Sequence, residues 1–369
     1  MSVPPPLPLS QRLDMVPAMV SVLVAALYTA AQGPFRGSEG AATFDRHMQN
    51  GITRQLAGRM SIPQLQFIRG TTAATFEKWA KANPEVHTHS EAVAEGTAIH
   101  WLGDKDADKI LLHLHGGGYI LPLSVGHLAL MNGLRQRVSQ ATGATVAVAF
   151  VEYSLAPIKP YPTQVREAHA GLQHLLSQGV APSKIILSGD SAGAHVVLCL
   201  IAHLLHPHPA LPAPLRPSTP FGGLLLISPR VSNSTTAASF SQNSHRDTLT
   251  RETFESWITN FRANGPVTTS EGLAKDGFYT EPVQAPSDWW DGLSDLIAKE
   301  VFVSAGEHEC MRDDIVKFAE NWKGLPGMNV VLEIEEKGIH DSPLMDASRP
   351  PSDLVKAIEA WLKIRVEAS

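Results

Sequence analysis

The chain has 369 residues, of which 43% are hydrophobic and 18% charged, and its formal net charge is −6. A chain of this length and composition can bury a large core, so we expect one large α/β domain with an accessory cap. The acidic balance leaves no basic footprint for nucleic acid, so no nucleic-acid partner is expected. Cys199 and Cys310 are the only cysteines and fit no disulfide framework, which favours an intracellular protein over a secreted one.

Near the N-terminus, residues 15–31 form an uncharged apolar stretch, with Asp14 before it and Arg36 after it. Its 17 residues are marginal for crossing a bilayer. Three interpretations stay open: a membrane anchor, a helix in the membrane interface, and a buried or lid helix of the protein itself. A cleaved signal peptide is disfavoured, because Arg12 is the only basic residue ahead of the stretch and Asp14 offsets it. We therefore expect a cytoplasmic or membrane-associated protein.

From residue 97 onward, strand-like and helix-like segments alternate. The strand-like segments are 97–101, 110–114, 145–151, 185–188, 224–228, 301–304 and 330–334, and the helix-like segments between them are 126–142, 162–178 and 194–205. Alternation of this kind predicts a mostly parallel central sheet with helices on both faces.

The alternation is interrupted after the strand that ends at residue 228, although a further helix-like segment lies at 251–263. We expect an insertion at 231–295 and an N-terminal segment at 1–95 to form a cap over the catalytic mouth, with apolar side chains from both lining the substrate pocket. The catalytic domain then comprises residues 96–230 and 296–369.

A glycine-rich loop, HGGGY at residues 115–119, directly follows the apolar segment 110–114. Glycines let the main chain come close to a ligand, so that backbone N–H groups can stabilise negative charge on a substrate oxygen. Taken alone, the loop is as readily an ordinary turn at the end of a strand.

A second glycine motif, GDSAG at residues 189–193, lies between the apolar segment 185–188 and a helix-like segment. A strand, a sharp turn with one serine and a helix together hold that serine in a strained conformation with its hydroxyl facing outward. Ser191 is therefore the candidate nucleophile. The order of the two motifs favours a hydrolase site over two unrelated turns.

The partners of such a nucleophile follow it in chain order, the acid first and the histidine last. The loop after the strand at 301–304 contains four acidic residues, which are Glu307, Glu309, Asp313 and Asp314. His340 follows the last predicted strand, where an imidazole can reach over the nucleophile and accept its proton. His340 is therefore the candidate base, and the position of the acid stays open at this point.

With its HGGG and GDSAG segments, the chain resembles the hormone-sensitive-lipase-like branch of the α/β-hydrolases from about residue 98 to the C-terminus. The resemblance implies the α/β-hydrolase fold and an oxyanion hole formed by the N–H groups of Gly117, Gly118 and Ala192. It also implies that His115 shapes the loop. Members of the family often pair, so a homodimer is one expectation.

The resemblance also selects an acid. Family members carry an aspartate in a D-P-L-R-D segment at this place, and matching its last two residues to Arg312 and Asp313 puts Glu309 where the acid stands. Two departures concern neighbouring loops: the family's YRLAPE reads YSLAPI at residues 153–158, and Ala194 replaces a frequent glycine.

These residues lead to a serine carboxylic-ester hydrolase acting on a small or medium-sized hydrophobic ester. Ser191 attacks, His340 moves the proton and Glu309 holds the imidazolium. No cofactor is implied. No metal is expected either, because the histidines at 203, 206 and 208 do not offer the converging ligands that zinc needs.

Two alternatives remain. The segments at 33–37 and 101–103 are similar to fungal members of the family, many of which act in secondary metabolism, which implies an acyltransferase or cyclase-type tailoring enzyme using the same nucleophile. The second alternative is a non-catalytic ligand-binding receptor on a hydrolase scaffold. Such receptors typically lack the base, whereas His340 is present here.

Overall fold

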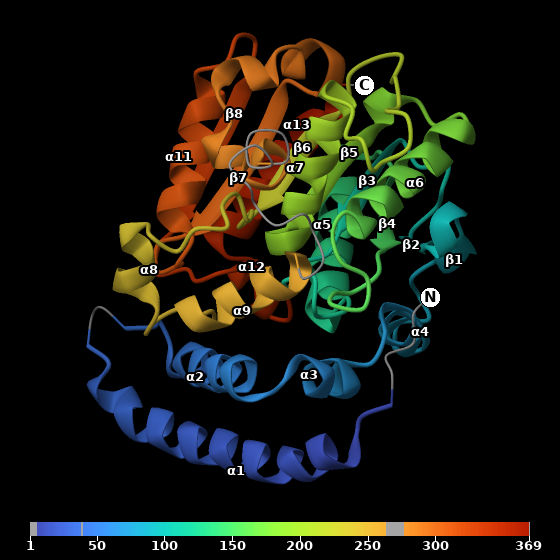
Figure 1. Ribbon diagram of the computed structural model, residues 1–369. Coiled ribbons are helices and arrows are strands. Elements are labelled where there is room, and N and C mark those ends of the chain that lie inside the picture. The colour runs from blue at the N-terminus through green and yellow to red at the C-terminus, as the bar shows by residue number, and fades with distance from the viewer. Residues whose placement is uncertain (1–5, 38–39, 263–276, 369) are drawn as a thin grey trace.

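A central sheet organises the protein, whose computed structural model describes residues 6–37, 40–262 and 277–368 (Figure 1). The described part has eight strands in the order β1-β2-β4-β3-β5-β6-β7-β8. Their bounds are β1 Thr88–Ala92, β2 Ala98–Leu102, β3 Lys109–Leu114, β4 Val146–Glu152, β5 Ile185–Asp190, β6 Gly223–Ile227, β7 Glu300–Gly306 and β8 Asn329–Glu335. Strands β3 to β8 pair in parallel, whereas β2 is antiparallel to β1 and β4. The predicted mostly parallel sheet is confirmed.

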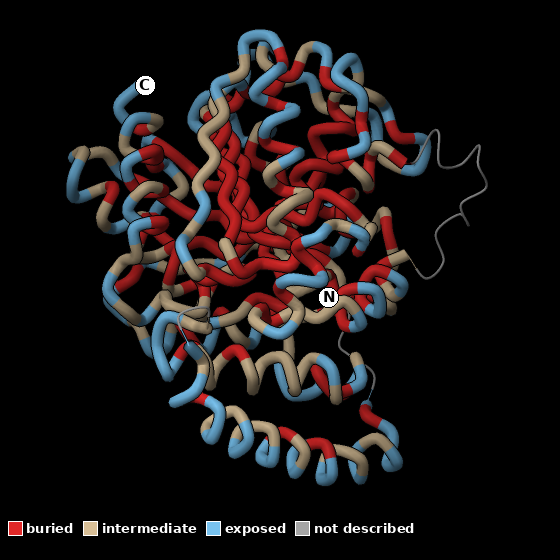
Figure 2. The backbone as a smooth tube through the Cα atoms, turned by 90° about the vertical axis from the view of Figure 1, so that its left-hand side faces the viewer, coloured by how far each residue is buried: buried red, intermediate tan, exposed pale blue. Residues whose placement is uncertain are grey.

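Helices cover both faces of the sheet. They are α4 Thr72–Ala82, α5 Val125–Thr142 and α13 Asp353–Glu367 on one face, and α6 Thr163–Ser177, α7 Ser191–Leu205 and α11 Arg312–Lys323 on the other. The central strands are buried along their whole length, as the red strands of Figure 2 show. Strands covered on both faces read as continuous apolar runs, which is why they could be found in the sequence.

The edge strand β1 was not predicted. Its sequence, THSEA, has no buried position, so it carries no apolar pattern. It lies inside the segment 1–95, which means that the sheet begins before the predicted boundary of the catalytic domain.

Two groups of helices lie beyond the carboxyl ends of the parallel strands (Figure 1). The insertion contributes α8 Ala238–Asn243 and α9 Arg251–Arg262, and the N-terminal segment contributes α1 Leu9–Gln32, α2 Phe44–Arg59 and α3 Ile62–Arg69. The short helix α12 Ser342–Met345 lies at the same end of the sheet. Residues 263–276 of the insertion lie outside the described residues. They include the last residue of the helix predicted at 251–263.

Helix α1 forms the outermost layer and contacts α2 and α3 (Figures 1 and 2). Ala18 and Val22 are the only buried residues of α1, so most of residues 15–31 lies at the surface, and the three interpretations of this stretch stay open. Among the described residues, this helix with the turn to Phe35 is the one segment long and apolar enough to cross a membrane by length and composition.

Candidate active site

Ser191 lies at the sharp turn between β5 and α7. Its φ of 48° falls in the left-handed region, which a serine rarely adopts and which the surrounding turn must enforce. The flanking glycines make the turn possible, since a Cβ on Gly193 would lie 1.9 Å from the carbonyl oxygen of Leu114 and one on Gly189 2.6 Å from the nitrogen of Ala194. The strained turn predicted from GDSAG is present.

His340 connects this hydroxyl to a carboxylate. Its Nε2 lies 2.7 Å from Oγ of Ser191, and its Nδ1 lies 2.8 Å from Oε1 of Glu309. The three side chains come from β5–α7, the loop after β7 and the loop after β8, and all are at least 94% buried. In the neutral ring whose Nδ1–H donates to the glutamate, Nε2 can accept the serine proton.

The second carboxylate oxygen of Glu309 is also fixed. Its Oε2 accepts from the hydroxyl of Ser228 at 3.0 Å and from the backbone N–H of Gly306 at 2.9 Å. Two other acidic residues of the loop bind elsewhere: Glu307 accepts from the N–H of Lys337, and Asp313 from the N–H of Ser239. Glu309 is therefore the acid of this loop that meets the imidazole.

The glycine-rich loop lies beside the nucleophile. Gly117 and Gly118 have φ values of 103° and 62°, which turn consecutive peptide groups in a way that L-residues resist. Among the described residues, neither amide donates a hydrogen bond. Ala192 is the second residue of α7, where helix N–H groups lack an intrahelical partner. Amides of this kind can receive the oxyanion of an acyl transfer.

The family described as the alpha/beta hydrolase fold matches residues 111–344 of the chain. The chain belongs to the α/β-hydrolase family. This confirms the family predicted from the HGGG and GDSAG segments.

Relatives of this α/β-hydrolase are named as esterases. It is 31% identical over 216 residues to an esterase of Acinetobacter venetianus, covering 58% of this chain and 61% of that protein. It is 24% identical over 241 residues to a carboxylesterase, NlhH, of Mycobacterium tuberculosis, covering 64% of this chain and 67% of that one. The chain therefore spans less than two thirds of the Acinetobacter relative.

The fold is also shared with solved esterase structures. The structure of the esterase EstE5 superposes with a TM-score of 0.65 at 25% identity, covering 88% of this chain and 99% of that one. A bacterial esterase of the hormone-sensitive lipase family superposes with a TM-score of 0.60 at 20% identity, covering 93% and 97%, which shows the fold alone.

Asp190 contacts the glycine-rich loop and does not cap the helix that follows it. Residue 190 is the N-cap position of α7, but its side chain makes no capping hydrogen bond. Its carboxylate instead accepts from the N–H of Gly116 at 2.9 Å and lies 3.1 Å from Nε2 of both His113 and His127. Burial opposes ionisation, but the two imidazoles keep the pKa of Asp190 below its ordinary value. Asp190 thus ties the start of the glycine-rich loop to the nucleophile turn.

Asp341, which the sequence reasoning missed, provides a second carboxylate beside the imidazole. Its Oδ2 lies 3.2 Å from Nε2 of His340. Burial alone lowers the pKa of His340, but the charges of Asp341, Glu309 and Asp247 outweigh it and raise the pKa to about 10. Burial also raises the pKa of Asp341, so this carboxylate and the imidazole of His340 compete for the same proton.

Asp247, from the cap insertion, was also missed. Its Oδ1 accepts from the N–H of His340 at 3.0 Å and its Oδ2 from the N–H of Cys310 at 2.7 Å. The side chain is fully buried, and burial raises its pKa. One carboxylate thus joins the base loop to the residue after Glu309. Nothing in a polar tract of sequence distinguishes such an aspartate from its exposed neighbours.

A third missed residue is Arg230, whose guanidinium is buried behind the glycine-rich loop. Its Nε donates to the hydroxyl of Tyr119 at 2.6 Å, and one terminal nitrogen lies 2.8 Å from the imidazole of His195 on α7. Phe261 of α9 stacks on Tyr119 with ring centroids 3.7 Å apart. On the same helix Trp257 packs so closely that a Cβ on Gly118 would lie 2.0 Å from its ring. The cap of the hydrolase therefore rests directly on the loop.

Proposed function

We propose that the protein is a serine carboxylic-ester hydrolase in which Ser191 is the nucleophile, His340 the base and Glu309 the acid. The observation that carries the proposal is the continuous hydrogen-bonded path from the serine hydroxyl through the imidazole to the carboxylate. The names of the relatives, which include esterases and an acetyl-hydrolase of Streptomyces hygroscopicus, support the same class of reaction.

The proposed reaction has two halves. Oγ of Ser191 attacks the acyl carbon while its proton passes to Nε2 of His340, and the carbonyl oxygen becomes an oxyanion that accepts from the amides of Gly117, Gly118 and Ala192. The ester C–O bond then breaks, and the imidazolium gives its proton to the departing alcohol. Water attacks the acyl-enzyme by the same route in reverse, which releases the carboxylic acid and restores the serine.

The substrate is proposed to be a small or medium-sized hydrophobic ester held under the cap. Helix α9 supports this, because its buried side chains are mainly apolar and two of them, Trp257 and Phe261, pack against the glycine-rich loop. The cap consists of the N-terminal helices and the insertion at 231–295. Cys199 and Cys310 are free and buried, which fits a reducing compartment.

Hydrolysis of p-nitrophenyl acetate and butyrate by the full chain tests the proposal. We expect turnover that Ser191→Ala abolishes while the variant keeps the thermal midpoint of the wild type within a few degrees. Full activity in Ser191→Ala would overturn the assignment of the nucleophile. Adding methanol as a second acceptor separates the alternatives. A methyl ester as the main product would indicate an acyltransferase. No turnover in either assay would indicate a receptor.

A further inference from the structure

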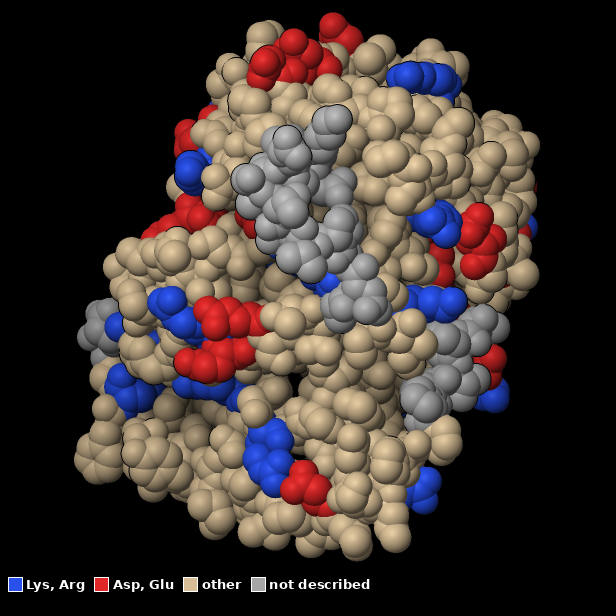
Figure 3. Space-filling view, viewed as in Figure 1, with Lys and Arg blue, Asp and Glu red and all other residues tan. Residues whose placement is uncertain are grey.

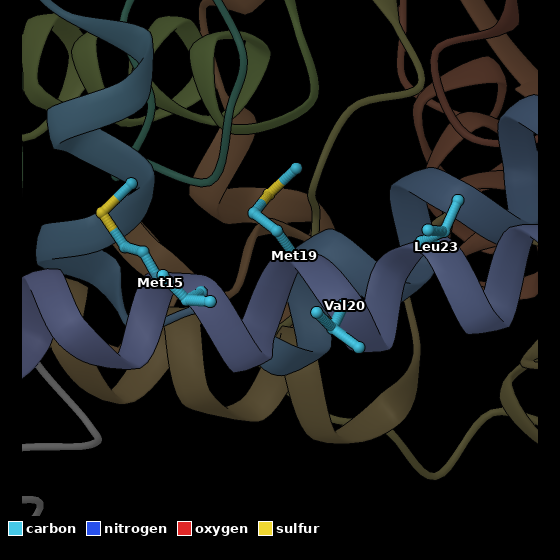
Figure 4. Close-up of a pocket in the computed structure, with 5 residues that line it drawn as sticks. Met15, Met19, Val20 and Leu23 are labelled. Atoms are coloured by element: carbon cyan, nitrogen blue, oxygen red, sulfur yellow. The ribbon is translucent and has the colours of Figure 1, made fainter.

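The outward surface of α1 is a continuous apolar face. Its large apolar side chains are all at least 49% exposed, and they recur every three or four residues along the helix: Leu9, Leu13, Val16, Met19, Val20, Leu23, Val24, Leu27 and Tyr28. We call these nine residues the outer face of α1. Figure 4 shows side chains that line a shallow pocket on this helix, with Met15, Met19, Val20 and Leu23 labelled. Figure 3 shows that the surface over α1 is mostly uncharged. A water-soluble surface rarely presents so extended an apolar patch without a partner.

The opposite side of α1 is fastened to the protein by polar contacts. Near its start, Asp14 forms a two-pronged ion pair with Arg59 of α2, with N–O distances of 2.8 and 3.1 Å, and also accepts from Gln64. Near its end, the carbonyl oxygen of Thr29 lies 3.0 Å from Nε2 of His47. Crossing a bilayer would break these contacts and carry Asp14 into hydrocarbon. The helix therefore lies flat against the protein, and its outer face forms one plane that is exposed at the surface.

Aromatic side chains mark the two ends of this plane. Phe35 follows α1 and is 86% exposed, and Phe67 near the start of α1 is 51% exposed. Arg12 lies over the ring of Phe67, with 6.0 Å between its guanidinium carbon and the ring centroid. Aromatic and basic side chains together are characteristic of helices that lie at the boundary between lipid headgroups and acyl chains.

The charge around the plane identifies the occupant. Of the six arginines in residues 1–70, Arg59 is paired with Asp14 and Arg46 with Asp346, so the basic character near the outer face comes from the arginines at the ends of α1. Arg12 and Arg69 are exposed at one end of α1, and Arg36 is half-buried just beyond the other. A second copy seated on the same face would bring arginine ends together, whether the two helices ran parallel or antiparallel, and like charges would meet. An anionic lipid surface complements both the apolar strip and the basic ends.

We propose that the outer face of α1 seats the protein on an anionic lipid bilayer, with the helix in the plane of the interface. Helices α9 and α12 lie between α1 and the sheet, so that the carboxyl ends of the parallel strands face the membrane (Figure 1). The docking surface does not depend on the proposed function. If that function holds, the site lies on the side from which an apolar ester in the bilayer would arrive.

Co-sedimentation of the full chain with vesicles tests the proposal. We expect binding to vesicles of phosphatidylcholine with phosphatidylglycerol and much weaker binding to pure phosphatidylcholine. The double variant L23E/L27E should lower the partition coefficient by about tenfold or more, because each substitution removes a large apolar side chain from the interface. R12Q/R69Q should weaken binding to the anionic vesicles only. The matched control is Ile364→Glu, which changes a side chain of α13 that is 55% exposed and should leave binding unaltered.

Three results would overturn the proposal. Equal binding to both kinds of vesicle would show that the arginines and the anionic lipid do not contribute to binding. Resistance of bound protein to extraction by alkaline carbonate would make α1 a spanning anchor. A dimer in sedimentation velocity that L23E/L27E dissociates, with no vesicle binding, would assign the outer face to a second copy. Because ester hydrolysis is measured separately in solution, failure here is distinguishable from failure of the proposed reaction.

Discussion

Oδ2 of Asp341 lies 3.2 Å from Nε2 of His340. In the proposed reaction the same ring nitrogen accepts the proton of Ser191, so the carboxylate competes with the serine hydroxyl for it. A negative charge at this distance favours the imidazolium, which cannot act as a base.

The first prediction concerns pH. The pKa of His340 is raised to about 10 by Asp341, Glu309 and Asp247, and only the neutral imidazole is active. Therefore kcat/KM should rise with pH on an alkaline limb. Asp341→Asn removes one of the negative charges and should move that limb to lower pH by about one to three units. The exposed change Asp353→Asn serves as the control, and a limb that stays in place in Asp341→Asn would refute the coupling.

A second prediction separates the acids of one loop. Glu309→Gln leaves the hydrogen bond to Nδ1 without a charged acceptor and should lower kcat by about 10³-fold or more, with thermal stability largely kept. Glu307→Gln is the matched control, because Glu307 accepts from Lys337 and has no contact with His340 among the described hydrogen bonds. Equal losses in the two variants would contradict the assignment of Glu309.

The third prediction concerns Asp247, a positioning residue. Asp247→Asn puts an amide where a carboxylate accepts from the backbone of His340 and Cys310. We expect a free energy of unfolding lower by about 2 kcal/mol or more, measured by urea denaturation. We also expect kcat to fall while KM is little changed, since the loops and not the pocket are displaced. A lower stability with an unchanged kcat would leave Asp247 with a purely structural role.

The fourth prediction concerns Arg230, which connects the glycine-rich loop with α7 through Tyr119 and His195. Arg230→Lys keeps the charge but cannot make both contacts at once. We expect kcat to fall by about tenfold or more through misplaced oxyanion amides, with little change in KM. Arg216→Lys is the control on a surface connection. An unaltered kcat in Arg230→Lys would show that the loop keeps its position without the guanidinium.

The sequence predicted the parts of the fold that leave a continuous local pattern. Strands such as β5 and β6 are buried on both faces and read as apolar runs, and Ser191 is found because its turn requires Gly189 and Gly193 at fixed positions. Strand β1 escaped notice, because an exposed edge strand needs no apolar residues.

Two missed residues of the site have a different property. Asp247 and Arg230 act through contacts that join segments distant in the chain, and Asp247 meets His340 across 93 positions. Asp341 is instead the chain neighbour of His340, and only the fold turns its carboxylate toward Nε2. A polar residue in a loop carries no local sign of such a partner. The proposed acid was reached only through the family resemblance, since position alone leaves four candidates: Glu307, Glu309, Asp313 and Asp314.

The most direct test is to map the adduct of a fluorophosphonate by mass spectrometry. This reagent forms a covalent bond only with a serine whose hydroxyl is activated, so it reports the path from Ser191 to His340 without knowledge of the substrate. The account predicts one adduct per chain on the peptide that contains Ser191, lost in Ser191→Ala and strongly slowed in His340→Ala. An unlabelled wild-type chain, or an adduct that persists in Ser191→Ala at the same rate, would contradict it.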